Sequence, residues 1–200
     1  MTFLARLLGL LLPACGAVGA QGLPVPPPLD IAHLTRPGSP NTALAAPAGF
    51  LPAPDIVTPT YRVSASRLYA AIQAVAAAQP RAFPAAAYAD RLQAHWVVRS
   101  AVFNFPDEVT AQASPAQASP AQPSAVQATP AQAAPDQAAP GQATSAQGIS
   151  AQGISEGTDT ATLVLYSRSV YGYGDLGANR QRVAAWLAAL DHMLDSANER

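Results

Sequence analysis

Glutamine recurs at every fifth position from Gln112 to Gln152, and prolines follow the same period. A five-residue period fits neither the turn of a helix nor the alternation of a strand, and proline removes backbone donors. The segment has almost no bulky apolar side chains to offset the entropy lost on ordering. We therefore predict that residues 113–157 form a disordered insert, so the core must come from the rest of the chain.

Composition points to one modest domain with appendages. The chain has 200 residues and 20 prolines, and its 50% hydrophobic fraction is rich in alanine, with only 6% aromatic residues. The net charge is −1 and no long basic run occurs, which argues against a nucleic-acid partner.

The N-terminus has the pattern of a secretion signal. Arg6 precedes the apolar run 7–12, which is far shorter than the ~20 residues that a membrane span requires. The following sequence, Leu12-Pro13-Ala14-Cys15-Gly16, resembles the bacterial lipobox. We predict that residues 1–14 are a signal peptide of the lipoprotein type and that Cys15 is the lipidation site. The protein would then be anchored to the membrane and face the periplasm. The alternative is cleavage after Ala20, which would give a soluble periplasmic or secreted protein.

Residues 15–56 are predicted to be a proline-rich tether and an extended segment that is laid over the folded domain without forming a layer of it. The stretch QGLPVPPP lacks any helical or strand period and favours a polyproline conformation. His33 has no second His or Cys at ligand spacing, so no metal site is expected here.

Residues 57–200 are predicted to form a single α+β domain. A helix is expected over 61–79, capped by Ser64 or Ser66 and stopped by Pro80. A long strand is expected over 91–105, with Leu92, Ala94, Trp96, Val98 and Val102 on one face and Gln93, His95, Val97 and Arg99 on the other. We interpret the second face as solvated; the alternative is that His95 and Arg99 line a groove.

The strongest predicted strand covers 160–169, and an apolar stripe predicts a final helix. That stripe consists of Val183, Trp186, Leu187, Leu190 and Leu194. The resulting fold is a small antiparallel sheet of about three strands packed with two helices, with the insert bulging from a strand hairpin.

Polar residues are concentrated between this last strand and the helix, in the segment from Tyr166 to Arg182, which we call the junction. Its glycines match neither a phosphate loop nor a dinucleotide fingerprint, and the chain has no Gly-x-Ser-x-Gly element, so no cofactor is predicted. The candidate site residues are Arg168, Tyr173, Asp175, Asn179 and Arg182.

Three segments together resemble a known family. Residues 173–182 (YGDLGANRQR) resemble the closing signature of domain-of-unknown-function family 1499, residues 100–109 (SAVFNFPDEV) its central element, and Ser39-Pro40-Asn41 its N-terminal element. No catalytic activity is established for this family, so the resemblance does not assign one to this chain. The family's two arginines would fall at Tyr166 and Val170, whereas this chain has Arg168 on the same strand face, and Gly174 replaces the usual serine.

Three functional interpretations follow for the junction. The first is ligand binding without chemistry by a lipid-anchored envelope domain. The second is a hydrolase or transferase, with Asp175 as general base and Arg168 or Arg182 stabilising an oxyanion. In the third the residues are structural: Asp175 caps the helix, Asn179 bonds the loop and Arg182 pairs with a carboxylate.

Overall fold

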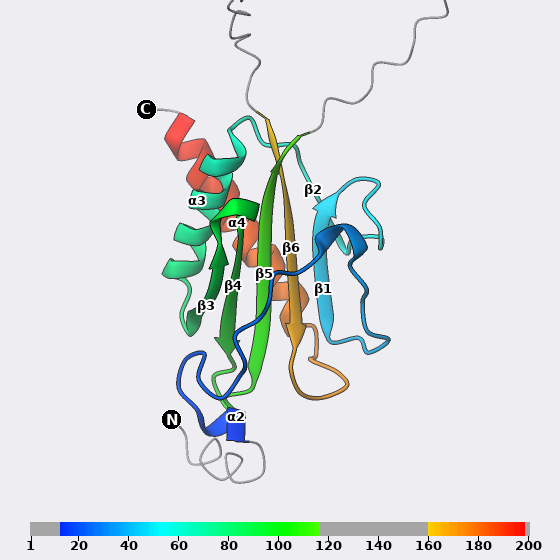
Figure 1. The fold of residues 1–200 in the computed structure, drawn as a ribbon, viewed down its shortest axis with the longest axis vertical. Helices are drawn as coiled ribbons and strands as arrows, with labels where there is room; N and C mark the ends of the chain where they lie inside the picture. The colour runs from blue at the N-terminus through cyan, green and yellow to red at the C-terminus, as the bar shows by residue number, and fades with distance from the viewer. Residues whose placement is uncertain (1–12, 117–159, 199–200) are drawn as a thin grey trace, which may run out of the picture. The chain divides into compact units, whose positions relative to one another are not determined.

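The computed structural model describes residues 13–116 and 160–198, which form a sheet of six strands covered by two helices on one face (Figure 1). The strands are β1 (Thr42–Pro47), β2 (Ile56–Thr58), β3 (Ala82–Tyr88), β4 (Gln93–Arg99), β5 (Pro106–Pro115) and β6 (Ala161–Ser169). The long helices are α3 (Ala65–Ala78) and α4 (Ala178–Asn198), and α2 (Pro13–Gly16) is a single turn near the N-terminus. Short 3-10 turns, η1 and η2, cover Ile31–His33 and Ala89–Arg91.

The α+β class with two covering helices is confirmed, but the predicted sheet of about three antiparallel strands is wrong. The strand order is β2-β1-β6-β5-β4-β3, and β2 runs parallel to β1, which makes the sheet mixed. The additional strands have weak sequence signals. β1 reads TALAAP and β3 reads AFPAAAY, both rich in alanine and both containing proline, which are depleted in strands. Pairing with stronger neighbours, rather than local propensity, therefore defines these strands.

Helices α3 and α4 bury their apolar stripes against one sheet face. Ser64 caps α3 by accepting a hydrogen bond from the Arg67 N–H at 3.2 Å. The rings of Trp96 and Trp186 meet edge to face, with centroids 5.6 Å apart. The five predicted core residues of the final helix are all buried in this cluster: Val183, Trp186, Leu187, Leu190 and Leu194. The amphipathic period thus correctly identified the packed side of α4.

Strands β5 and β6 form the central hairpin of the sheet. Their register runs from Asp107 opposite Ser169 to Pro115 opposite Ala161. The strand therefore continues three residues into the predicted insert, because buried Ala113 still packs into the core opposite Leu163. Residues 117–157 of the predicted insert lie outside the described residues.

The other predicted strand, over 91–105, is shorter than expected. β4 ends at Arg99, and residues 100–105 turn back into β5, with Asn104 in the left-handed region at φ 58°. Val102 is consequently exposed rather than part of the core face.

The second sheet face is covered by the N-terminal segment. Residues 15–34, here called the strap, cross this face, and Ile31 and Leu34 form a second apolar cluster with Leu44, Val164 and Tyr166 (Figure 1). The interpretation of this face as solvated is therefore wrong for His95 and Arg99, which are both buried. The expectation that the N-terminal segment covers the domain holds for the strap. It does not hold for residues 42–47, which form β1 inside the sheet.

Candidate functional site

The junction begins where β6 ends and finishes in the first turns of α4. Asp175 lies just before the helix, and its two carboxylate oxygens accept hydrogen bonds from the N–H groups of Gly177 at 2.9 Å and Asn179 at 2.7 Å. Partial burial favours a raised pKa for this carboxyl, but the hydrogen bonds from Asn179 and Gly177 together outweigh it and hold the pKa below its ordinary value. Asp175 therefore stabilises the helix start as an ionised acceptor.

Asn179 is the centre of the junction. Its side chain is fully buried, and its Nδ2 donates to the Asn41 carbonyl at 2.9 Å and to Asp175 Oδ2 at 2.7 Å. Nδ2 also lies 2.9 Å from Ser169 Oγ, and Oδ1 accepts from Ser167 Oγ. A single amide thus ties α4 to the end of β6 and to the start of β1.

Arg182 completes this network from the next turn of α4. Its Nη2 pairs with Asp107 Oδ2 at 2.6 Å, and its Nη1 donates to Ser167 Oγ at 2.9 Å and to Asn179 Oδ1 at 2.8 Å. The side chains of Arg182 and Asp107 are only 13% and 9% exposed, so the ion pair is almost fully withdrawn from water.

The three segments that carry the family resemblance converge at this network. Asn41, from the N-terminal segment, donates its Nδ2 to the Gly172 carbonyl at 2.6 Å, and Ser39 Oγ donates to Asn41 Oδ1 at 2.7 Å. The central segment contributes Asp107, and the closing segment contributes Asp175, Asn179 and Arg182. Asn41, Asp107 and Ser167 were not predicted as site residues. The first two lie in the resembling segments, and Ser167 lies on the side of β6 that faces α4.

Two of the five predicted residues lie outside the network. Arg168 projects from the opposite sheet face, where it forms an ion pair with Glu108, directly across the strand pair. Tyr173 is 75% exposed in the loop before α4. The side-chain alternation of β6 explains the separation: Ser167 faces the helices and Arg168 faces away.

Because both carboxylate oxygens of Asp175 accept hydrogen bonds at the start of α4, Asp175→Ala is expected to lower the free energy of unfolding by about 1–2 kcal/mol at neutral pH, as loss of a helix cap does. Denaturant titration at pH 7 measures this change. Asp195→Ala removes an exposed carboxylate near the other end of the same helix and should change stability by less than ~0.5 kcal/mol. An unchanged midpoint for Asp175→Ala would instead favour a role in ligand binding.

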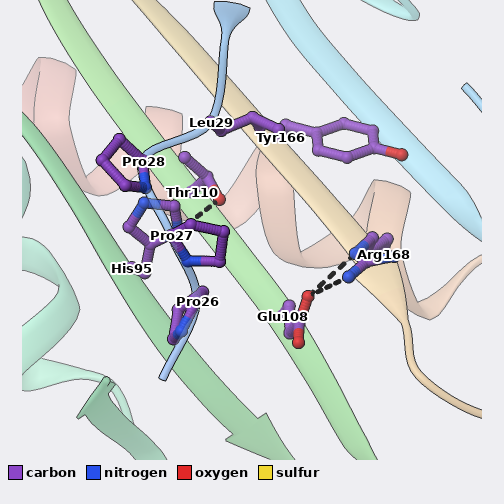
Figure 2. Close-up of a pocket in the computed structure, with 9 residues that line it drawn as sticks. All are labelled: Pro26, Pro27, Pro28, Leu29, His95, Glu108, Thr110, Tyr166 and Arg168. Carbon is purple, nitrogen blue, oxygen red and sulfur yellow. Dashed lines mark hydrogen bonds and ion pairs between the residues drawn. The ribbon is translucent and has the colours of Figure 1, made fainter. Parts of the chain in front are cut away.

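Arg168 contributes to a separate cavity on the strap-covered face, with a volume of about 150 Å³ (Figure 2). Its floor comes from β4, β5 and β6, and residues 26–29 of the strap form one wall. The polar lining consists of His95, Glu108, Thr110, Tyr166 and Arg168. This arrangement corresponds to the alternative in which His95 lines a groove; Arg99, by contrast, is enclosed by the strap.

His95 is held neutral in this cavity. Its Nε2 donates to Gln93 Oε1 at 2.9 Å, and its Nδ1 lies 3.0 Å from Thr110 Oγ1, so the hydroxyl donates to the ring. Burial lowers the pKa of the imidazole, and the charge of Glu108 only partly opposes this effect.

Stability should consequently depend on the protonation of His95. Unfolding lets the imidazole recover its ordinary pKa of about 6.5, so the free energy of unfolding should fall as the pH drops from 7.5 through that value. Denaturant titrations between pH 7.5 and 5 measure this slope. His95→Gln should flatten it, whereas His33→Gln, at an exposed position, should retain it. An identical slope in both variants would contradict the assignment.

The strap is fixed to the sheet by side chains that bind its backbone. Gln93 accepts from the Leu29 N–H at 2.7 Å and donates to the Leu29 carbonyl at 2.8 Å. Arg99 donates to the carbonyls of Gly19 and Gln21, both at 2.8 Å. The first part of the predicted tether is therefore bound to the domain by these contacts.

The predicted lipidation residue lies at the start of the strap. Asn104 Nδ2 donates to the Cys15 carbonyl at 2.6 Å and to the Ala17 carbonyl at 3.0 Å. The Cys15 thiol is buried, and burial raises its pKa. Acylation therefore requires the thiol to leave this position.

Within residues 13–116 and 160–198, His, Cys, Asp and Glu side chains form no group of three or more that could hold a metal ion. No helix in the same part of the chain combines the length and the apolar character needed to cross a membrane.

Comparison of the chain with protein-family models, curated proteins and solved structures found no significant match.

Proposed function

We propose that this protein is a lipid-anchored module of the cell envelope with a non-catalytic role, in which the junction is structural and the strap-covered cavity is the place for a ligand. The observation that carries the non-catalytic assignment is the closed set of contacts around Asn179. Asp175, Asn179 and Arg182 direct their polar groups at one another, at Asp107 and at backbone groups.

The enzyme alternative requires Asp175 to act as a general base. A base is most effective when its pKa lies near the working pH, and the hydrogen bonds to Asp175 shift its pKa in the opposite direction. Both oxygens already accept hydrogen bonds from the start of α4. These contacts support helix capping and give no support to acid–base chemistry.

A binding role finds better support on the other sheet face. The cavity combines an apolar wall, residues 26–29, with the Glu108–Arg168 ion pair. The Arg168 side chain is 51% exposed, so a ligand with an anionic group can compete with Glu108 for the guanidinium. In this proposal, Arg168 belongs to the binding site, whereas Arg182 belongs to the structural network of the junction.

The anchor is supported by the lipobox resemblance at residues 12–16 and by the position of the only cysteine. Acyl chains on Cys15 would hold the domain at a membrane surface, since several chains anchor stably where one is marginal. The family resemblance remains a prediction and is consistent with a role without known chemistry.

Metabolic labelling with palmitate tests the anchor directly. The wild-type chain expressed in a bacterium that processes lipoproteins is expected to incorporate the label and to sediment with membranes. Cys15→Ser should lose both properties, because it removes the acceptor thiol. A wild-type protein that takes up no palmitate would contradict the lipoprotein assignment and favour cleavage after Ala20.

A further inference from the structure

One end of the sheet exposes a group of large apolar side chains. They come from the start of the strap, from the turn between β4 and β5, and from the loop between β6 and α4. The residues are Val18 (63% exposed), Val102 (54%), Phe103 (42%), Tyr173 (75%) and Leu176 (101%). We call this group the tip.

The pairing of the strands brings these segments to the same end. The β4–β5 turn leads into β5 at Pro106, and the next residue, Asp107, lies opposite Ser169, the last residue of β6. The Val170 N–H donates to the Pro106 carbonyl at 3.1 Å, which joins the following loop to the start of β5. In Figure 1 these loops and α2 lie at the lower end, whereas β5 ends at the upper end.

Cys15 is fixed at the tip by its backbone. Asn104, in the β4–β5 turn, binds the carbonyls of Cys15 and Ala17, which lie on either side of Gly16 and just before Val18. The Cys15 backbone is therefore held beside the turn that exposes Val102 and Phe103, and an acyl chain on Cys15 would start next to this turn once the thiol has left its buried position.

The turn is held rigidly. The Ser100 N–H donates to the Phe105 carbonyl at 2.9 Å, and Ser100 Oγ accepts from the Phe105 N–H at 2.9 Å. Arg81 Nη2 binds the Ser100 carbonyl at 2.8 Å and Asn104 Oδ1 at 2.7 Å. Because the turn is already ordered, little conformational entropy is lost when its apolar side chains bind a surface.

Two exposed arginines at this end suit an anionic surface, and the carboxylate next to Leu176, that of Asp175, is engaged in hydrogen bonds with the start of α4. Arg81 and Arg180 are both exposed, one beside the β4–β5 turn and the other in the first turn of α4. Tyr and Phe side chains favour the boundary between headgroups and acyl chains, and arginines at that depth are attracted to anionic lipids.

We propose that the tip is a membrane-contacting surface, which inserts Phe103, Tyr173 and Leu176 into the interface of the bilayer that holds the Cys15 anchor. This inference rests on the proposed lipid anchor. It adds that the domain is oriented on the membrane, with the end of the sheet that carries the β4–β5 turn and the β6–α4 loop facing the bilayer.

A fluorescent label at the tip tests the contact. In the acylated protein the Cys15 sulfur is bonded to lipid, so the thiol introduced by Leu176→Cys is the sole free thiol and accepts an environment-sensitive fluorophore. The control is Leu51→Cys, whose side chain is also exposed, at 79% against 101% for Leu176. It lies in the loop after β1, and β1 runs away from the tip because Thr42 pairs with Arg168. Both labelled lipoproteins are reconstituted into vesicles of phosphatidylethanolamine and phosphatidylglycerol and titrated with iodide.

The label at position 176 is expected to show a blue-shifted emission and several-fold weaker iodide quenching than the label at position 51. The same two labels in the unacylated Cys15→Ser background, without vesicles, should be quenched equally. Equal quenching of the two labels on vesicles, in protein that carries palmitate, would overturn the membrane contact and leave the anchor intact. Absence of palmitate from the wild-type chain would overturn both.

Discussion

Arg182→Met is expected to lower the free energy of unfolding by about 3–5 kcal/mol, because it leaves the buried Asp107 carboxylate without its ionic partner. The unbranched methionine side chain fills the space of the arginine's aliphatic part, so the loss mainly reports the ion pair with Asp107 and the hydrogen bonds to Ser167 and Asn179. Denaturant titration at pH 7 measures the change.

The ion pair between Arg168 and Glu108 supplies a control. Arg168→Met removes the same charge from a pair whose arginine side chain is 51% exposed, and it should cost less than ~1 kcal/mol. Replacing both members of the buried pair, as Asp107→Leu with Arg182→Met, should restore part of the lost stability, because no charge is then left unpaired. Equal costs for the two single substitutions would contradict the structural assignment of Arg182.

Asn179→Ala is expected to cost about 2–4 kcal/mol, because it removes the donor for Asp175 and Asn41 and the acceptor for Ser167 and Arg182 at once. Each buried polar group that loses a partner costs about 1–3 kcal/mol, and part of that cost is recovered by the remaining contacts among these groups. Thermal and denaturant unfolding both measure this effect.

Ser169→Ala is the control for Asn179→Ala, since it removes only one of the hydrogen bonds to Asn179 and should cost about 0.5–1.5 kcal/mol. A loss of similar size in both variants would show that Asn179 is not the centre of the network. If Asn179→Ala left the free energy of unfolding nearly unchanged but altered ligand binding, Asn179 would instead have a role in recognition.

The sequence-based predictions succeeded where a periodic pattern determined the structure. The apolar stripe of α4, the helix with its cap at Ser64 or Ser66, and the strand over 160–169 follow from local sequence patterns, and they correspond to α4, to α3 with its cap at Ser64, and to β6. Of the five junction residues predicted as one site, Asp175, Asn179 and Arg182 share one network because they lie close together at the start of α4, whereas Arg168 and Tyr173 lie outside it.

The features that were not predicted from the sequence depend on contacts between residues far apart in the chain. β1 and β3 have no strong strand signal of their own, and their place in the sheet depends on β6 and β4 as neighbours. Similarly, Arg99 looks like a solvent-facing strand residue until the strap, about 80 positions earlier in the chain, supplies carbonyls for its guanidinium. The alternation of residues along one strand gives no information about a hydrogen-bond partner so far away in the chain.

The paired ends of β5 and β6 have a consequence for how the gene can change. The Ala116 N–H donates to the Thr160 carbonyl at 2.8 Å, so both ends of the intervening segment are closed by the ladder itself. Doubling the length of a closed loop costs only about 0.6 kcal/mol. Slippage of the five-residue coding unit can therefore add or delete copies with little effect on folding, and lineages that carry this domain should tolerate wide variation in repeat number.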